Sequence, residues 1–193
     1  MRRLLLVRHA ATAATRAAAF PDDRDVLDER ALAAAATLGS ALPSRCEAVS
    51  SPAARCRQTA AAAGLEAATD PALAECDFGT WARRTLAEIA AEDPDGVSRW
   101  MLDPHAAPHG GETLTSFAGR VGTWLDEQAR RDGPAVAITH GGVVKAMVVH
   151  ALGAPLEAFW RIDVAPLTIT EIHAHDGRWT ITRTNCPAGS PAS

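Results

Sequence analysis

The sequence predicts an α/β layered domain with a mostly parallel central sheet. Short unbroken apolar runs, such as residues 2–7 and 134–139, are typical of strands buried on both faces. Longer segments rich in alanine and leucine, which favour helix, separate these runs. The 193 residues, 47% hydrophobic and 22% charged, suffice for one domain with a proper core. Strands that alternate with helices in this way build layered α/β domains.

The first half of the chain contains two strand–helix pairs followed by a loop. Leucine and valine fill the first strand, and the first helix is built largely from alanine. Gly64 is expected to end the second helix, because glycine readily adopts the left-handed conformation found after helix C-termini. Residues 70–84 contain Pro71, Gly79 and few periodic apolar positions, so we expect mostly loop there. In chain order we predict a strand at 2–7, a helix at 27–42, a strand at 46–51 and a helix at 54–64.

The second half repeats the alternation and ends in a hairpin. A helix at 85–93 is expected to stop before Pro94, and residues 103–112, with two prolines and two glycines, are expected to be irregular. Asp176-Gly177 is typical of a tight turn between two strands. We therefore predict helices at 113–131 and 141–152 and strands at 134–139, 167–174 and 178–184. Residues 1–186 form one predicted domain, and 187–193 are expected to be a disordered tail.

Polar and charged residues follow three of the predicted strands. Arg8 and His9 come directly after the first strand, and Ser51 and then Arg55 follow the second. His140 stands just past the strand at 134–139. Ligands of open α/β sheets bind beyond the carboxyl ends of the strands. We therefore expect two arginines and two histidines to meet at one rim of the sheet.

This rim has the parts of a phosphate site. Arginine offers a fork of permanently charged donors to phosphate oxygens, and Gly141-Gly142 begin a helix whose free N–H groups favour an anion. A histidine nitrogen can accept a phosphoryl group covalently, and clustered positive charge supports that transfer. A carboxyl group is the usual proton donor for the leaving oxygen. Glu75 is our candidate, because its neighbours Phe78 and Trp81 are apolar and would raise its pKa.

Charge and cysteine content exclude several classes of partner. A net charge of -4 and a pI near 6.0 argue against nucleic acid and anionic membranes. The apolar run near the start is too short for a signal peptide, and no stretch is long enough to span a bilayer. The four cysteines lack CxxC and metal-ligand spacing, so we expect free thiols in a cytoplasmic protein without metal or other cofactor. The expected partner is a small-molecule phosphate ester, and we leave a homodimer open.

Five short motifs occur in the order used by a known family. They are LVRHAAT, SSPAARCRQTA, LAECDFGTW, HGGET and THGG. In this order, and across nearly the whole chain, they resemble the histidine phosphatase superfamily, the phosphoglycerate mutase-like proteins. The resemblance implies a three-layer α/β/α fold. It also implies that His9 is the phospho-accepting nucleophile, that Arg8, Arg55 and His140 bind the phosphoryl group, and that Glu75 is the proton donor.

Further positions follow from the same resemblance, and some depart from the family pattern. Thr12 would lie at the phosphate loop, and the backbone N–H of Gly141 would hold a phosphate oxygen. Ala10 stands where the family usually has glycine, and Thr15 stands where it has asparagine. Thr15 is shorter than asparagine, so we leave it outside the predicted site. Arg83 replaces part of a Glu-Gly pair after Trp81 and is a candidate contact for a negatively charged substrate.

The leading hypothesis is a phosphoric monoester hydrolase: a metal-independent phosphomonoesterase that works through a phosphohistidine on a small phosphorylated metabolite. The mutases of the family usually carry insertions that cover the site and exclude water, and this chain is short between Trp81 and Gly110. The short length and the HGGET motif favour the α-ribazole phosphatase-like branch, so the candidate substrates are α-ribazole phosphate and a sugar phosphate. A phosphoglycerate-type mutase and a non-catalytic phospholigand-binding module stay open as alternatives.

Overall fold

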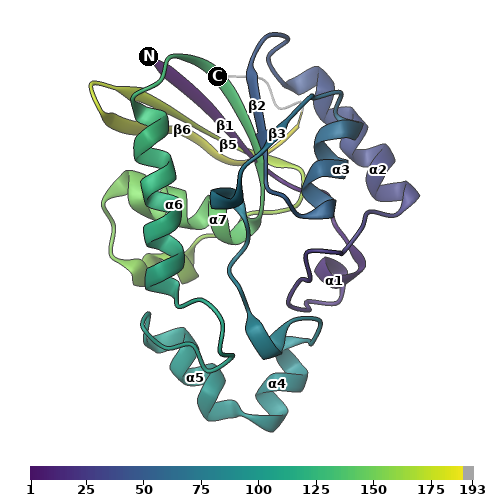
Figure 1. Cartoon of the computed structure of the whole chain (residues 1–193), viewed down its shortest axis with the longest axis vertical. Coiled ribbons are helices and arrows are strands. Elements are labelled where there is room, and N and C mark those ends of the chain that lie inside the picture. Colours follow the sequence, from purple (N-terminus) through teal and green to yellow (C-terminus); the bar gives the residue numbers. More distant parts are fainter. Residues whose placement is uncertain (189–193) are drawn as a thin grey trace.

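A single sheet forms the centre of the structure. Within residues 1–188, which the computed structural model describes, six strands occur in the order β3-β2-β4-β1-β5-β6 (Figure 1). They are β1 (Arg2–Arg8), β2 (Glu47–Ser50), β3 (Ala68–Thr69), β4 (Gly133–Thr139), β5 (Thr168–His175) and β6 (Arg178–Pro187). The first four pair in parallel, whereas β5 runs antiparallel to both β1 and β6. The predicted mostly parallel sheet is therefore confirmed.

Helices cover both faces of the sheet, which gives the predicted three layers. Leu4 of β1 is in one core cluster with Phe117 and Met147, and the next residue, Leu5, is in another with Cys56. Successive strand residues point to opposite faces, so β1 contributes to both clusters. The layers contain α2 (Glu29–Ala36) and α3 (Ala54–Ala62) on one side of the sheet and α6 (Leu114–Ala129) and α7 (Gly141–Leu152) on the other (Figure 1).

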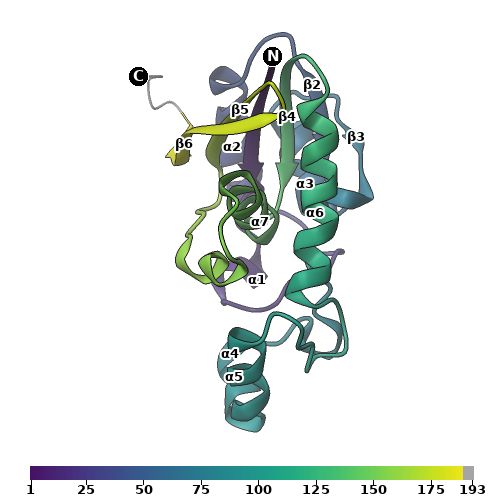
Figure 2. The ribbon, with the colours of Figure 1, turned by 90° about the vertical axis from the view of Figure 1, so that its left-hand side faces the viewer.

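Two further helices lie away from the sheet. These are α4 (Leu86–Glu92) and α5 (Pro94–Leu102), and both views place them beyond the carboxyl ends of the parallel strands (Figures 1 and 2). The predicted helix at 85–93 corresponds to α4, but α5 was not predicted. Pro94 was expected to end a helix, and it also begins the next one, with the Asp93 side chain accepting the Gly96 N–H as a cap.

Several short elements complete the described chain. The predicted helix at 27–42 is α-helical only through Ala36 and continues as a 3₁₀ helix. The other short segments are α1 (Ala13–Arg16) and the 3₁₀ helices η1 (Thr37–Ala41), η2 (Pro71–Leu73), η3 (Gly79–Trp81) and η4 (Leu156–Arg161). No helix within residues 1–188 has the length and hydrophobicity needed to cross a membrane.

The C-terminal hairpin forms at the predicted turn. Asp176 and Gly177 have φ values of 48° and 73°, the left-handed pair required by a two-residue type I′ connection. Strand β6 then runs to Pro187, one residue past the predicted domain boundary. The rest of the predicted tail, apart from Ala188, lies outside the described residues.

Candidate active site

The ends of three parallel strands bring the predicted arginine and histidines together. His9 follows β1, Arg55 lies in the first turn of α3 after β2, and His140 follows β4 and precedes α7. The Arg55 Nε lies 3.2 Å from His9 Nε2, and its Nη2 lies 3.1 Å from His140 Nδ1. Arg55 therefore lies between the two imidazoles. All three side chains are buried, His140 completely.

The hydrogen bonds of His9 determine which ring nitrogen carries the proton. Its Nδ1 lies 2.7 Å from the Ala10 carbonyl oxygen, which can only accept, so Nδ1 is protonated. Its Nε2 accepts from the Arg55 guanidinium and keeps the lone pair. Burial and then the neighbouring Arg55 charge lower the pKa of His9 to about 3. His9 is therefore a neutral imidazole with a lone pair on Nε2 at neutral pH.

His140 has the opposite tautomer. Its Nδ1 accepts from Arg55, so the proton lies on Nε2, which donates to the Ser51 hydroxyl at 2.8 Å. Burial lowers the pKa of His140 well below its ordinary value, and the charge of Arg55 adds to this effect. In the absence of an anion, both imidazoles are therefore neutral and held in fixed orientations.

A cavity of about 220 Å³ lies beside His9, and we call it the rim cavity. The Arg8 side chain lines it, and its buried Nε has no hydrogen-bond partner within residues 1–188. Gly141 lies close to this guanidinium, since a Cβ there would be 3.3 Å from Arg8 Nε. The helix α7 starts here without a side-chain cap, so the N–H group of its first residue, Gly141, is available. An unpaired guanidinium N–H beside an open helix N-terminus fits an anion.

Glu75 lies in the wall of the rim cavity. Its two carboxylate oxygens accept the backbone N–H groups of Cys76 and Gly142, at 3.0 and 3.2 Å. Both hydrogen bonds favour the charged form, but burial outweighs them and raises the pKa of Glu75. A carboxyl group with a raised pKa that faces a cavity next to a neutral histidine is suited to proton donation.

The loop that carries Glu75 is held against the loop of the HGGET motif. The Thr80 N–H donates to the His109 carbonyl at 2.9 Å, and the Glu112 N–H donates to the Asp77 carbonyl at 2.8 Å. The Glu112 carboxylate itself accepts two hydrogen bonds from Arg120, at 3.2 and 2.8 Å. Glu112 is thus engaged by a cation and does not line the rim cavity.

Lys145 is a site residue that the sequence interpretation missed. It lies one helical turn after Gly141 on α7 and lines the rim cavity together with Asp163. Its ammonium lies 5.4 Å from the Phe159 ring centroid, and burial lowers its pKa. The spacing from Gly141 was the available signal, because residues four apart share a helix face.

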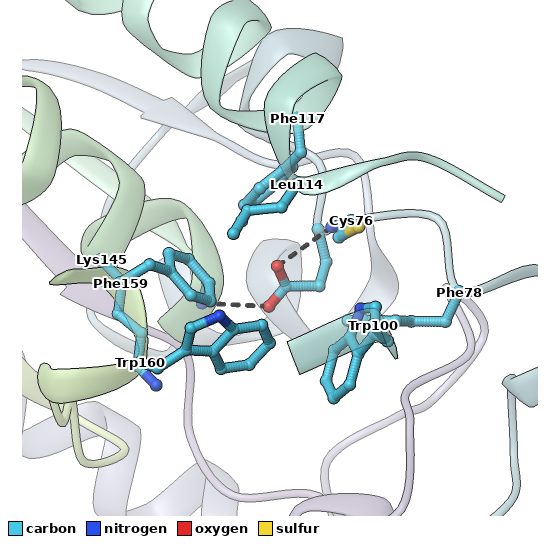
Figure 3. A pocket seen from close by; sticks show the side chains of 10 residues that line it. Cys76, Phe78, Trp100, Leu114, Phe117, Lys145, Phe159 and Trp160 are labelled. Carbon is cyan, nitrogen blue, oxygen red and sulfur yellow. Dashed lines mark hydrogen bonds between the residues drawn. The ribbon is translucent and has the colours of Figure 1, made fainter. Parts of the chain in front are cut away.

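A second cavity, which we call the aromatic pocket, adjoins the rim cavity. It has a volume of about 190 Å³ and shares Glu75, Gly142 and Lys145 with the rim cavity. Figure 3 shows the indoles of Trp100 and Trp160 on one side of it and Leu114 and Phe117 on the other. Neither tryptophan was assigned to the site from the sequence.

Two predicted substrate contacts lie elsewhere in this structure. The Thr12 side chain accepts the Thr15 backbone N–H and caps α1, whereas Thr15, which was left out of the predicted site, lines the rim cavity. Arg83 is exposed and lines neither the rim cavity nor the aromatic pocket. Their roles stay predictions. Among residues 1–188, no His, Cys, Asp and Glu side chains are grouped as a metal ion would require.

Comparison with known proteins identifies relatives across most of the chain. The family model of the histidine phosphatase superfamily (branch 1) matches residues 4–187. Glucosyl-3-phosphoglycerate phosphatase of Mycolicibacterium vanbaalenii is 32% identical over 175 residues, which cover 81% of this chain and 77% of that protein. Phosphoserine phosphatase 1 of Hydrogenobacter thermophilus is 30% identical over 131 residues, 66% of this chain. The chain spans 62% of the length of that phosphatase and 40% of the bifunctional Mycobacterium tuberculosis protein that it also matches.

Solved structures share the fold. The α-ribazole phosphatase of Shigella flexneri superimposes with a TM-score of 0.85 over 98% of this chain and 99% of its own, at 24% identity, a likeness of fold alone. A mycobacterial glucosyl-3-phosphoglycerate phosphatase in complex with VO3 has a TM-score of 0.82 at 28% identity, over 96% of this chain and 100% of its own. With a family match over residues 4–187, the chain belongs to the histidine phosphatase superfamily, branch 1.

Proposed function

We propose that the chain is a metal-independent phosphomonoesterase that works through a phosphohistidine at His9. The observation that carries the proposal is the state of His9, a neutral imidazole whose Nε2 lone pair lies at the rim cavity among arginines. A nitrogen nucleophile needs this lone pair and a fixed orientation. Membership of the family and the phosphatase activities named for the relatives support a phosphoric monoester hydrolase.

The phosphoryl group binds where positive charge and free donors gather. Arg8 and Arg55 donate to its non-bridging oxygens, and the backbone N–H of Gly141, at the start of α7, donates a further hydrogen bond. Arg55 then gives up its hydrogen bond to His9 Nε2. His140 accepts from Arg55 in the free protein, and a bound dianion raises the pKa of this histidine and makes it a donor. The arginines and His140 supply the charge that a metal ion supplies in other phosphatases.

In the first chemical step, the Nε2 lone pair of His9 forms a bond to phosphorus as the bond from phosphorus to the ester oxygen breaks. Glu75, protonated because burial raises its pKa, transfers its proton to that oxygen, and the alcohol leaves. In the second step the Glu75 carboxylate removes a proton from water. The resulting oxygen bonds to phosphorus, the P–N bond breaks, and inorganic phosphate leaves with His9 restored.

Candidate substrates come from the relatives. Phosphoserine, glucosyl-3-phosphoglycerate and α-ribazole phosphatases stand among the matches, and each name refers to a small phosphorylated metabolite. We propose that the substrate of this chain is also a small phosphorylated metabolite, with α-ribazole phosphate and sugar phosphates as the first compounds to test.

Trapping the intermediate tests the proposal. Rapid quenching of the protein with a ³²P-labelled ester in the presence of chelator should yield about one equivalent of acid-labile, alkali-stable label on His9. His9→Ala should yield none, and the exposed His175→Gln should label like the wild type. Labelling of His9→Ala, or a requirement for added metal, contradicts the proposal. Transfer of the label to an added alcohol in preference to water would instead favour a mutase.

A further inference from the structure

The aromatic pocket lies where the leaving group of a bound ester would go. Glu75, Gly142 and Lys145 line both this pocket and the rim cavity, so the proposed proton donor stands on their common wall. An ester whose phosphorus lies beside His9 brings its bridging oxygen to Glu75. From Glu75 the carbon skeleton of the alcohol can continue into the aromatic pocket or into a larger pocket, which charged side chains such as Asp22, Arg24 and Arg120 line. An apolar alcohol fits only the aromatic pocket.

The walls of this pocket are made mainly of rings. The ring centroids of Trp100 and Trp160 are 4.7 Å apart with planes at 75°, and Phe159 lies edge-to-face on Trp160 at 5.1 Å. Both indoles are only half-buried and border the pocket (Figure 3). A planar guest can lie against such surfaces in the stacked or edge-to-face arrangements that aromatic rings favour.

The size and polarity of the pocket select among alcohols. A cavity of about 150 Å³ lined by apolar side chains accommodates benzene, so about 190 Å³ accommodates one ring with a short linker. The polar side chains that line the pocket, Glu75 and Lys145, belong to the wall that it shares with the rim cavity. Elsewhere the pocket offers only the Cys76 thiol and the indole N–H groups of the two tryptophans, so most hydroxyl groups of a sugar would lose their hydrogen bonds to water without replacement.

We propose that the leaving alcohol of the substrate carries a planar aromatic or heteroaromatic ring on a short linker, and that this ring binds in the aromatic pocket against Trp100 and Trp160. The inference rests on the proposed function, because the roles of His9 and Glu75 fix the orientation of the ester. It makes the two tryptophans specificity-determining residues.

Three primary alkyl phosphates test the proposal: ethyl phosphate, 2-phenylethyl phosphate and glucose 6-phosphate. Their leaving oxygens are similar, so differences in kcat/KM report on the rest of the alcohol. Burial of the ring should raise kcat/KM for 2-phenylethyl phosphate about tenfold above that for ethyl phosphate. The ratio should fall to about threefold or less in Trp100→Leu and Trp160→Leu. Trp179→Leu, on β6 and outside the pocket, should keep the wild-type ratio.

Binding of 2-phenylethylphosphonate and ethylphosphonate, measured by calorimetry, repeats the comparison without turnover and also shows that each variant is folded. The inference is overturned if the wild type shows a ratio near one between the 2-phenylethyl and ethyl compounds, or if this ratio is unchanged in both pocket variants. A preference for glucose 6-phosphate also overturns it. The proposed function survives those outcomes provided that phosphate is released. If no ester is hydrolysed, the proposed function fails, and phosphonate binding alone tests the inference about the pocket. Stronger binding of 2-phenylethylphosphonate than of ethylphosphonate supports the inference, and equal or absent binding overturns it.

Discussion

Opposing effects set the pKa of the Glu75 side chain. Burial raises its pKa, while the backbone N–H groups of Cys76 and Gly142 and the charges of Arg55 and Arg8 lower it. The net result is a raised pKa, which keeps a larger fraction of the carboxyl protonated than in water. A strongly basic leaving group needs a proton most, so the rate gain expected from the proposed proton donation by Glu75 depends on the ester.

We predict that Glu75→Gln lowers the rate of phosphorylation of His9 by about two to four powers of ten on an alkyl phosphate. The loss on p-nitrophenyl phosphate should be clearly smaller, because nitrophenolate leaves without a proton. Single-turnover measurements are required, since slow hydrolysis of the phosphohistidine would mask the difference. Equal losses on both esters would contradict proton donation.

The pH dependence of kcat/KM gives an independent check on proton donation by Glu75. Above its raised pKa Glu75 loses its proton, so kcat/KM of the wild type on an alkyl phosphate should fall as pH rises. Since the pKa of His9 is about 3, this proposed nucleophile stays neutral throughout this range. Ionisation of the substrate affects both proteins equally, so it cancels in the ratio of the wild-type kcat/KM to that of Glu75→Gln. This ratio should itself decline as pH rises. A constant ratio would exclude Glu75 as the acid.

At the scale of elements, α7 begins in contact with the proposed acid. A Cβ on Gly142 would lie 2.3 Å from Glu75 Oε1, so a larger residue there must displace the carboxylate. The same residue donates its N–H to Glu75. The helix therefore requires glycine at this position because of the close approach of Glu75, and not because of its own backbone conformation.

We predict that Gly142→Ala lowers kcat on alkyl phosphates by about 100-fold, the effect of moving a catalytic group by about 1 Å. Gly119→Ala in α6 is the matched control, because a Cβ at Gly119 has nothing within 4 Å. Thermal unfolding should show Gly119→Ala as stable as the wild type or more so, since alanine favours helix over glycine. Gly142→Ala should be less stable, because the buried carboxylate must move, but still folded at the assay temperature. Full activity of Gly142→Ala would show that the carboxylate position is not critical.

The elements differ in how far the sequence determines them. The helix at 141–152 was predicted with its observed bounds, because glycines begin it and an apolar run continues it. The rim residues His9 and Arg55 were predicted because each closely follows a strand. In contrast, β3 has two residues and exists only by pairing with β2, which no local pattern specifies. Trp100 and Trp160 reach one pocket from α5 and η4, and that meeting depends on tertiary packing alone.

At the scale of the whole molecule, the site lowers stability in acid. His9 and His140 have folded-state pKa values below the ordinary value of 6.5, so the unfolded chain binds more protons than the folded chain below that pH. Stability is therefore fully present above about pH 6.5 and is lost as pH falls toward the folded-state pKa. This loss is a consequence of keeping two imidazoles buried and neutral next to arginine.

We predict that each of these histidines decreases the free energy of unfolding by up to about 1.4 kcal/mol for each pH unit below 6.5. Urea unfolding between pH 7 and 5 should show this slope in the wild type. His9→Asn should reduce the slope of unfolding free energy against pH by the contribution of about one proton. The exposed His175→Gln should leave this slope unchanged. An unaltered slope in His9→Asn would show that His9 accepts a proton while folded.

The segment that contains α4 and α5 begins after Asp77–Thr80 and ends before His109–Glu112. Two backbone hydrogen bonds join these two flanking stretches. A segment whose ends already meet can be replaced or lengthened without disturbing the strands on which the arginines and histidines depend. One wall of the aromatic pocket, through Trp100, belongs to this segment. Exchange of this segment would therefore change the wall of the aromatic pocket, and with it the proposed choice of alcohol, without moving the arginines and histidines at the strand ends.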